Sequence, residues 1–221
     1  MDGDAVRIER LTRRKRGRPG EEIEILLSDA SSFFLALRLW EERPIHEGDS
    51  LTPQQIQKLQ KASTRIAVRA QALSLLARAE HSRFMLSQKL AVRGRDSAVT
   101  APVLDALEQE GLLDDRRFAE SWVRHRLRRH PEGRSALVAG LRQRGIGADI
   151  ADGVVDQVTA AEGISMENQA RILARKLLRA RNATPRSVAT RLLRRGFATS
   201  LVRRIMEELS EPDDRIDDPN H

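Results

Sequence analysis

The chain has 221 residues, of which 39 are Lys or Arg and 32 are Asp or Glu, so its formal net charge is +7. This basic balance favours a polyanionic or acidic partner. The sequence has no Cys, which excludes disulfides, thiolate metal sites and Cys nucleophiles. It has no apolar run long enough to span a membrane, and its N-terminus is charged, so we expect a soluble cytoplasmic protein.

Residues 1–20 are the first segment of the predicted organisation. They are rich in Arg and contain almost no side chain to bury, so we expect a disordered basic arm. Such an arm can contact nucleic acid, or it can be a solvated tail without a specific partner. The sequence leaves both readings open.

Residues 21–61 are predicted to hold a β-hairpin and a connecting segment. The apolar runs Glu22–Leu27 and Phe33–Leu37 are separated by five turn-forming residues, which indicates two strands joined by a turn. Two strands alone are marginally stable in water, so we expect the hairpin to pack on the first helices. Thr52 followed by Pro53 predicts the start of a helix.

The remainder of the chain repeats itself with a period of 51 residues. The shift aligns residues suited to cap helix N-termini and glycines suited to end helices in a left-handed conformation. Each repeat is therefore predicted to contain three helices. The aligned helix starts are Ser63, Asp114 and Ser165, and the aligned helix ends are Gly94, Gly145 and Gly196.

The predicted fold is mainly α: three tandem three-helix repeats in a curved, elongated array, with an N-terminal β-hairpin. The repeats cover residues 62–111, 112–163 and 164–209, and an acidic tail follows over residues 210–221. Each unit is too small to bury a generous core alone, so neighbouring units should stack. Pro102 is compatible with the third helix of the first repeat only if that helix begins near Thr100.

The sequence offers no constellation for catalysis or for metal binding. It has no phosphate-binding loop and no Ser/His/Asp arrangement, and we read Asp114 as a cap because Ser occupies the equivalent positions. We therefore expect no enzyme activity, no cofactor and no metal. The histidines are scattered and expected at the surface: His46, His81, His125, His130 and His221.

Charge placement in the central repeat favours binding. Its second helix carries Arg134, Arg142 and Arg144 without an acidic residue. Its third helix, Ala148–Ala161, carries aspartates and no basic residue, so we expect a basic side and an acidic side. Because phosphates would repel an acidic third helix, we do not expect sequence-specific duplex recognition of the helix-turn-helix kind.

A cation in the last helical turn also has a purely structural explanation. Arg93, Arg144 and Arg195 align under the 51-residue shift, and each precedes one of the helix-ending glycines. There a positive charge interacts favourably with the helix dipole, by a few tenths of a kcal/mol. These arginines are therefore weaker indicators of a binding surface than basic residues elsewhere on the helices. For any single one of the other arginines, a solvated face is still the commoner explanation.

Two stretches of the sequence resemble the RecX family of recombinase regulators. The first is the string EGLLDDRRFA at Glu110–Ala119, and the second runs from Ala72 through Ser82 and Leu86 to Arg93-Gly94. The resemblance covers about Thr64–Leu209. The chain departs from the family at residues 130–133, where members often have a glycine-rich G-x-G-P, and in having no Tyr.

The resemblance implies a non-enzymatic protein that binds the RecA filament on single-stranded DNA. Lying in the groove of the filament, it would restrain strand exchange, ATP hydrolysis and co-protease activity, and so moderate the SOS response. The implied partners are the filament and single-stranded DNA, directly or through the filament, with no membrane and with the chain as a monomer. The alternative is a non-sequence-specific nucleic-acid binding module.

On either reading, basic side chains of the helices are the candidate contacts to the partner. They are Lys89, Arg93, Arg124, Arg128, Arg129, Arg134, Arg142, Arg144, Arg191 and Arg195.

Overall fold

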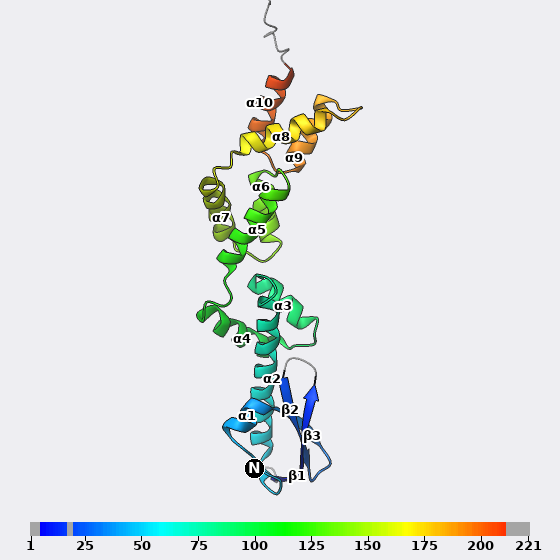
Figure 1. Cartoon of the computed structure of the whole chain (residues 1–221), viewed down its shortest axis with the longest axis vertical. Helices are drawn as coiled ribbons and strands as arrows, with labels where there is room; N and C mark the ends of the chain where they lie inside the picture. The colour runs from blue at the N-terminus through cyan, green and yellow to red at the C-terminus, as the bar shows by residue number, and fades with distance from the viewer. Residues whose placement is uncertain (1–4, 17–19, 211–221) are drawn as a thin grey trace, which may run out of the picture. The chain divides into compact units, whose positions relative to one another are not determined.

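The computed structural model describes residues 5–16 and 20–210, and Figure 1 shows the elements that they form. The chain divides into two compact units, Met1–Asp114 and Asp115–His221. Apart from residue 210, the predicted acidic tail lies outside the described residues. In the described part of the chain, no helix combines the length and the apolar character needed to cross a membrane.

A four-stranded antiparallel sheet opens the first unit. Its strands are β1 (Val6–Arg16), β2 (Gly20–Leu27), β3 (Ser32–Ala36) and β4 (Ser50–Leu51), in the order β3-β2-β1-β4. Strands β2 and β3 form the hairpin expected from the sequence. The buried core of the sheet includes Ile25 and Leu35, and Ile56 and Leu59 pack against this core.

The prediction of a disordered arm is wrong for Val6–Arg16, because this segment is strand β1. Ile8 is buried in the sheet core, and the strand pairs with β2 through a bulge between Ile8 and Arg10. Arg13 forms an ion pair with Glu21, and Arg14 forms one with Glu24. In the register of the two strands these pairs are diagonal neighbours, and opposite charges within reach of each other across strands stabilise a sheet. Charges that suggest disorder by composition therefore support strand pairing here.

Helix α1 (Leu37–Glu42) follows the sheet, and helix α2 (Pro53–Leu76) then serves both halves of the first unit. Its N-terminus has a capping box, in which the Thr52 hydroxyl accepts a hydrogen bond from the backbone N–H of Gln55. The first part of α2 packs on the sheet, and Val68 and Ala72 enter the core of the first repeat.

Ser63 does not cap a helix, contrary to the prediction, because α2 runs through it without a break. The side chain is buried, and its Oγ accepts a hydrogen bond of 2.9 Å from the backbone N–H of Ala36 at the end of β3. A serine that looks like a helix start in the sequence therefore joins the helix to the sheet.

The mainly helical fold with three-helix repeats behind N-terminal strands is confirmed. The first repeat consists of the second part of α2 with α3 (Arg83–Ala91) and α4 (Ser97–Gln109). The second repeat comprises α5 (Asp115–Arg129), α6 (Arg134–Arg142) and α7 (Ala148–Ala161). The third comprises α8 (Met166–Leu178), α9 (Pro185–Arg194) and α10 (Thr199–Ser210).

The local starts and ends of these helices largely follow the aligned residues. Gly94, Gly145 and Gly196 have φ angles of 73°, 80° and 82°, the left-handed conformation in which glycine ends a helix. One boundary differs from the expectation. Helix α4 begins at Ser97 rather than near Thr100, so Pro102 lies inside the helix.

Within the second unit, the second and third repeats meet where the N-terminus of α6 contacts the turn after α9. Gly133 donates a backbone hydrogen bond of 2.9 Å to the Arg195 carbonyl, and both Ser135 N–H and Oγ donate to the Gly196 carbonyl. Helix α6 has no side-chain cap, so these carbonyls satisfy N–H groups that the helix leaves unpaired. A Cβ atom on Gly133 would lie 2.1 Å from the Gly196 oxygen, which restricts this position to glycine.

Candidate polyanion-binding surface

In the first and second repeats, some arginines that the sequence suggests are available to a binding partner form ion pairs inside the fold. Arg134 on α6 contacts Asp152 at 2.8 Å and Asp156 at 2.7 Å, both on α7. The hydrogen bond from Arg134 lowers the pKa of the Asp156 carboxyl below its ordinary value. In the first unit, Arg83 on α3 likewise pairs with Asp105 on α4. The expected separation of a basic α6 from an acidic α7 is therefore wrong at these positions, because the two helices neutralise each other.

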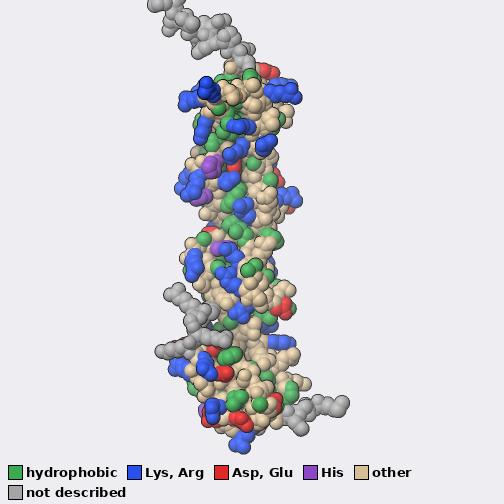
Figure 2. All heavy atoms as spheres, turned by 90° about the vertical axis from the view of Figure 1, so that its right-hand side faces the viewer, with side chains coloured by type: hydrophobic (Ala, Val, Ile, Leu, Met, Phe, Trp, Pro, Cys, Tyr) green, Lys and Arg blue, Asp and Glu red, His purple; other side chains and the backbone are tan. Residues whose placement is uncertain are grey.

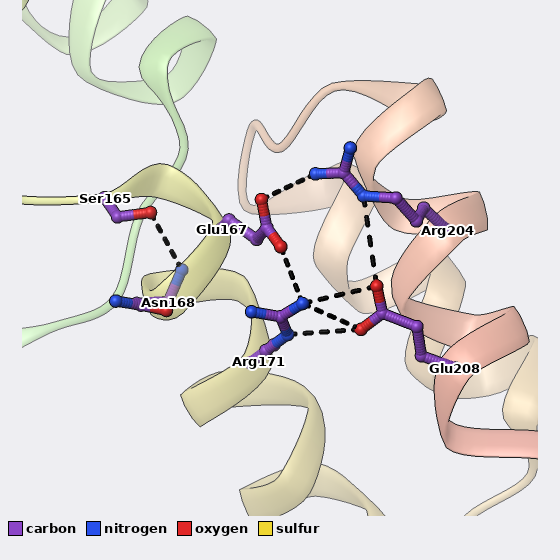
Figure 3. A network of polar contacts seen from close by, with 6 residues as sticks. All are labelled: Ser165, Glu167, Asn168, Arg171, Arg204 and Glu208. Carbon is purple, nitrogen blue, oxygen red and sulfur yellow. Dashed lines mark hydrogen bonds and ion pairs between the residues drawn. The ribbon is translucent and has the colours of Figure 1, made fainter.

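Figure 3 shows a different ion-pair network in the third repeat, where two arginines and two glutamates join the first helix, α8, to the third, α10. Glu167 lies 2.6 Å from Arg171 and 2.6 Å from Arg204, and Arg171 lies 2.9 Å from Glu208. Beside this network, the Ser165 hydroxyl accepts a hydrogen bond of 3.3 Å from the backbone N–H of Asn168, which is the contact of an N-cap. These ion pairs stabilise the packing of α8 against α10.

Arg124 and Arg144, two further candidate contacts, also have partners inside the second repeat. Arg124 reaches Glu120 at 3.3 Å and Glu162 at 3.2 Å. Arg144 donates to the Gly140 carbonyl at 2.7 Å, and its guanidinium carbon lies 4.8 Å from the centroid of the Trp122 ring. Both side chains thus stabilise the packing of α5, α6 and α7.

Glu132 has a structural role that was not predicted from the sequence. Its side chain lies in the loop before α6, and the residue is only 4% exposed. It accepts two hydrogen bonds of 2.8 Å from Arg126 and one of 3.3 Å from Arg195 in the third repeat. The Glu132 carboxylate raises the pKa of Arg126. The candidate Arg195 therefore links the second repeat to the third.

The other candidate contacts remain exposed, and within residues 5–16 and 20–210 none of them has a carboxylate partner. Arg93 and Arg128 donate only to backbone carbonyls, those of Lys89 and Arg124. This set consists of Lys89 and Arg93 in the first unit, and of Arg128, Arg129, Arg142 and Arg191 in the second.

Helices α8 and α9 add basic residues that were not among the candidates. From Asn168 to Met206 the sequence has eleven Lys and Arg and no Asp or Glu. This run of positive charge is visible in the sequence and could have been used to predict these residues. Several of these are exposed and have no carboxylate partner in the described part of the chain: Arg175, Lys176, Arg179, Arg181, Arg186 and Arg194. In the upper part of Figure 2, which looks onto the side of the second unit bearing these helices, blue side chains are frequent and red ones few.

We define the basic surface as the exposed cations of the second unit that lack a carboxylate partner, on α5, α6, α8 and α9 and in the loop between α8 and α9. Phosphates and carboxylates are the groups that such a surface attracts. Helices α8 and α9 contain no aromatic residue, so this part of the surface has no platform for stacking bases. Its chemistry suits contact with a charged backbone or an acidic protein face.

The histidines and aspartates of the sequence form no further site in the described residues. His81 is buried, contrary to the prediction, and its Nδ1 lies 2.7 Å from the Ala79 carbonyl. His46, His125 and His130 are exposed, and His221 lies outside the described residues. Helix α5 begins immediately after Asp114, the position of an N-cap. Among the described residues, no group of three or more potential ligands could hold a metal ion.

Comparison with known proteins gives consistent matches. A family model described as the second three-helix domain of RecX matches residues 114–155. The regulatory protein RecX of Halorhodospira halophila is 44% identical over 153 residues, which cover 67% of this chain and 92% of that relative. The regulatory protein RecX of Thermobifida fusca is 37% identical over 158 residues, which cover 69% of this chain and 84% of that relative.

A solved structure matches most of the chain. The crystal structure of a regulatory protein RecX has a TM-score of 0.69 and 25% sequence identity, covering 91% of this chain and 99% of that one. The region matched by the family model, residues 114–155, includes α5 and α6, which carry Arg128, Arg129 and Arg142.

Proposed function

The chain belongs to the RecX family of regulatory proteins, and from this we propose that it binds the RecA recombinase filament on single-stranded DNA and restrains it. The restrained activities are strand exchange, ATP hydrolysis and co-protease activity, in DNA repair and the SOS response. The chain acts in the cytoplasm as a monomeric binding protein, without catalysis or a cofactor.

The basic surface is the observation that supports this proposal. Arginines such as Arg134 and Arg171 hold the helices of each repeat together, and their charge is neutralised there. Arg128, Arg129, Arg142 and Arg191 stay exposed without a carboxylate partner in the described residues. Cations that the fold does not use are available to a net negative partner, and opposite charge raises the rate of association with it.

The proposed contact residues differ from the candidates named from the sequence, because some candidates are removed and other residues are added. Arg124, Arg134, Arg144 and Arg195 are assigned to the fold, because each has an internal partner. Lys89 and Arg93 stay in the proposal for the first unit. The basic residues of α8, of α9 and of the loop between them join it: Arg175, Lys176, Arg179, Arg181, Arg186 and Arg194.

A second candidate function is direct binding of nucleic acid without the recombinase. The acid-free stretch from Asn168 to Met206 favours it, because eleven cations without an intervening carboxylate suit a phosphate backbone. Such a module would bind naked single strands as well as coated ones. Its affinity would fall steeply with salt, with a slope near −0.7 per phosphate contact on single strands.

Binding to naked and to recombinase-coated single strands, measured by co-sedimentation across a salt series, separates the two functions. We expect the chain to bind coated strands more tightly, and to keep this preference at about 0.2 M salt, where exposed charges are strongly screened. A parallel salt series without nucleotide serves as the control. Equal affinity for naked and coated strands at every salt concentration would exclude the filament-binding function in favour of the simple module.

A further inference from the structure

Helix α3 in the first unit holds an aromatic side chain at the surface. The chain has five Phe, two Trp and no Tyr. Phe84 is 44% exposed, whereas the other Phe and Trp residues are buried or half-buried. A single exposed apolar residue is ordinary, so its neighbours decide whether the ring has a role.

Further exposed side chains continue this surface along one side of α3. Phe84, Gln88 and Val92 are spaced by four residues, which places them in one row on the helix. Gln88 is exposed, and Val92, which directly follows α3 and keeps helical backbone angles, is 89% exposed. This row, which we call the α3 row, offers an aromatic ring, an amide and an aliphatic side chain over about 12 Å of helix.

Two cations adjoin the α3 row. Lys89 and Arg93 directly follow two of its members in the sequence, and both are exposed. Neither has a carboxylate partner within residues 5–16 and 20–210. Arg93 donates one hydrogen bond of 2.8 Å to the Lys89 carbonyl, and a guanidinium has five N–H groups in all. Both side chains are therefore suited to contact an anion.

The acidic side chains of the neighbouring helix do not neutralise these cations. Residues 83–95, which include α3, contain no Asp or Glu. The acidic residues of α4 are Asp105 and Glu108, and both form ion pairs with Arg83. Asp96 caps α4, where its carboxylate accepts a hydrogen bond from the backbone N–H of Ala98.

An exposed ring beside cations suits single-stranded nucleic acid. Bases of any sequence stack on aromatic side chains, while a positively charged surface follows the phosphates. Helices α8 and α9 have the cations and no ring. The 51-residue shift aligns Phe84 with Ser135 and Arg186, so at this position the ring is confined to the first repeat.

We propose that the α3 row binds single-stranded nucleic acid, with a base stacked on the Phe84 ring and phosphates beside Lys89 and Arg93. This rests on the proposed function, in which single-stranded DNA is part of the partner, and it assigns direct contact with the strand to the first unit. An apolar pocket on a protein is the competing occupant. Such a pocket accepts Leu in place of Phe84, whereas stacking requires the ring.

Fluorescence anisotropy with a labelled oligothymidylate and with an abasic strand of the same length tests the stacking. Both ligands present the same phosphates, and only the first has bases. Phe84→Leu keeps an apolar side chain without the ring. We expect it to weaken oligothymidylate binding at least about fivefold, the lower end of what stacking of one base contributes. Binding of the abasic strand should stay unchanged, and Phe84→Tyr should bind both strands as the unmodified chain does.

Leu193→Ala is the matched control. Leu193 is 43% exposed on the basic helix α9, but it has no ring, so its loss should leave oligothymidylate binding unchanged. Circular dichroism checks that every variant is folded. Equal oligothymidylate binding by Phe84→Leu and the unmodified chain overturns the proposal and favours the protein pocket. An equal loss on both strands also overturns it, because that loss does not depend on the base.

The dependence on salt separates the ring from the cations. Stacking releases no counterions, so Phe84→Leu should lower the affinity by the same factor at every salt concentration. Lys89→Gln should instead reduce the slope of log affinity against log salt by about 0.7, the value for one phosphate contact. A reduced slope with Phe84→Leu contradicts stacking. These measurements use no recombinase, so their failure leaves the filament-binding function to be decided by co-sedimentation.

Discussion

The contact between the second and third repeats includes the buried carboxylate of Glu132. This carboxylate forms ion pairs with Arg126 and Arg195, and the residue is only 4% exposed. Removing one partner of a fully buried ion pair costs about 3–5 kcal/mol. The side chains of Arg126 and Arg195 are 44% and 47% exposed, so both can turn to solvent and the cost is smaller.

We therefore expect Glu132→Ala to lower the free energy of unfolding by about 1–2 kcal/mol, the cost of losing charged hydrogen bonds without stranding a buried charge. Glu132→Gln keeps the shape and one acceptor oxygen, and should lie between Ala and the unmodified chain. Urea denaturation followed by circular dichroism measures both. If neither substitution changes the denaturation midpoint, the buried carboxylate does not hold the repeats together.

Gly133 is the second residue on which this junction depends. A Cβ there would lie 2.1 Å from the Gly196 oxygen, and backbone atoms cannot move aside as a flexible side chain can. Gly133→Ala should cost about 3 kcal/mol through the separation of the two backbones. At Gly153, inside α7, a Cβ meets no atom within 4 Å, so Gly153→Ala should instead stabilise by about 0.5–1 kcal/mol.

Thermal unfolding of these two glycine variants checks the prediction directly. In a chain of this size, 1 kcal/mol shifts the melting temperature by about 2–4 °C, so the two variants should move in opposite directions. Similar melting temperatures for Gly133→Ala and Gly153→Ala would show that α6 and the turn after α9 are not in close contact.

At the scale of elements, the bridge between α6 and α7 gives the second repeat a dependence on pH. The pKa of Asp156 is lowered by its hydrogen bond from Arg134, below the ordinary value of 3.8. A carboxyl with a lowered folded pKa stabilises the fold above its unfolded pKa and loses this contribution as the pH falls through the folded value. Because the Asp156 side chain is 60% exposed, the contribution is at most about 1 kcal/mol.

Arg134→Gln should therefore lower the melting temperature at pH 7 by a few degrees, and the difference from the unmodified chain should shrink below about pH 4. Arg142→Gln is the matched control, since Arg142 is exposed on the same helix and has no carboxylate partner among the described residues. If the melting temperature of Arg134→Gln stays below that of the unmodified chain by a constant amount down to pH 3, the contact is not an ionic bridge.

Local signals in the sequence predicted element types and most helix ends. Thr52 and Thr184 cap helices that begin with proline, and Gly94 ends a helix, because these residues act on their own neighbours. Ser63 and strand β1 were misjudged, because their roles depend on strands distant in the sequence. Repeat spacing thus predicts helices well, and it says little about how a helix is shared with a sheet.

The candidate surface was less predictable than the fold. Basic composition could be read from the sequence, but which arginines the fold neutralises could not. Arg134 finds its carboxylates on α7, and Arg195 finds Glu132 in another repeat. Such pairings depend on how the helices pack. The charges along α6 alone therefore made both Arg134 and Arg142 candidate contacts.

At the scale of the whole molecule, the basic residues divide into those that join helices and those left exposed. This division allows a sharper test than reversal of any set of arginines. Arg128, Arg129 and Arg142 belong to the exposed set of the second repeat, and their reversal disturbs no carboxylate contact among the described residues. Arg43, Lys58 and Lys61, exposed in the first unit and outside the proposed surface, supply a control with the same change in charge.

The most direct measurement is ATP hydrolysis by recombinase filaments on single-stranded DNA in the presence of each triple Glu variant. Circular dichroism must show both variants folded, as expected for surface reversals. We predict that reversing Arg128, Arg129 and Arg142 abolishes most of the inhibition, whereas reversing Arg43, Lys58 and Lys61 leaves most of it. Full inhibition by the first variant, or an equal loss with both, would contradict binding through the exposed cations of the second repeat.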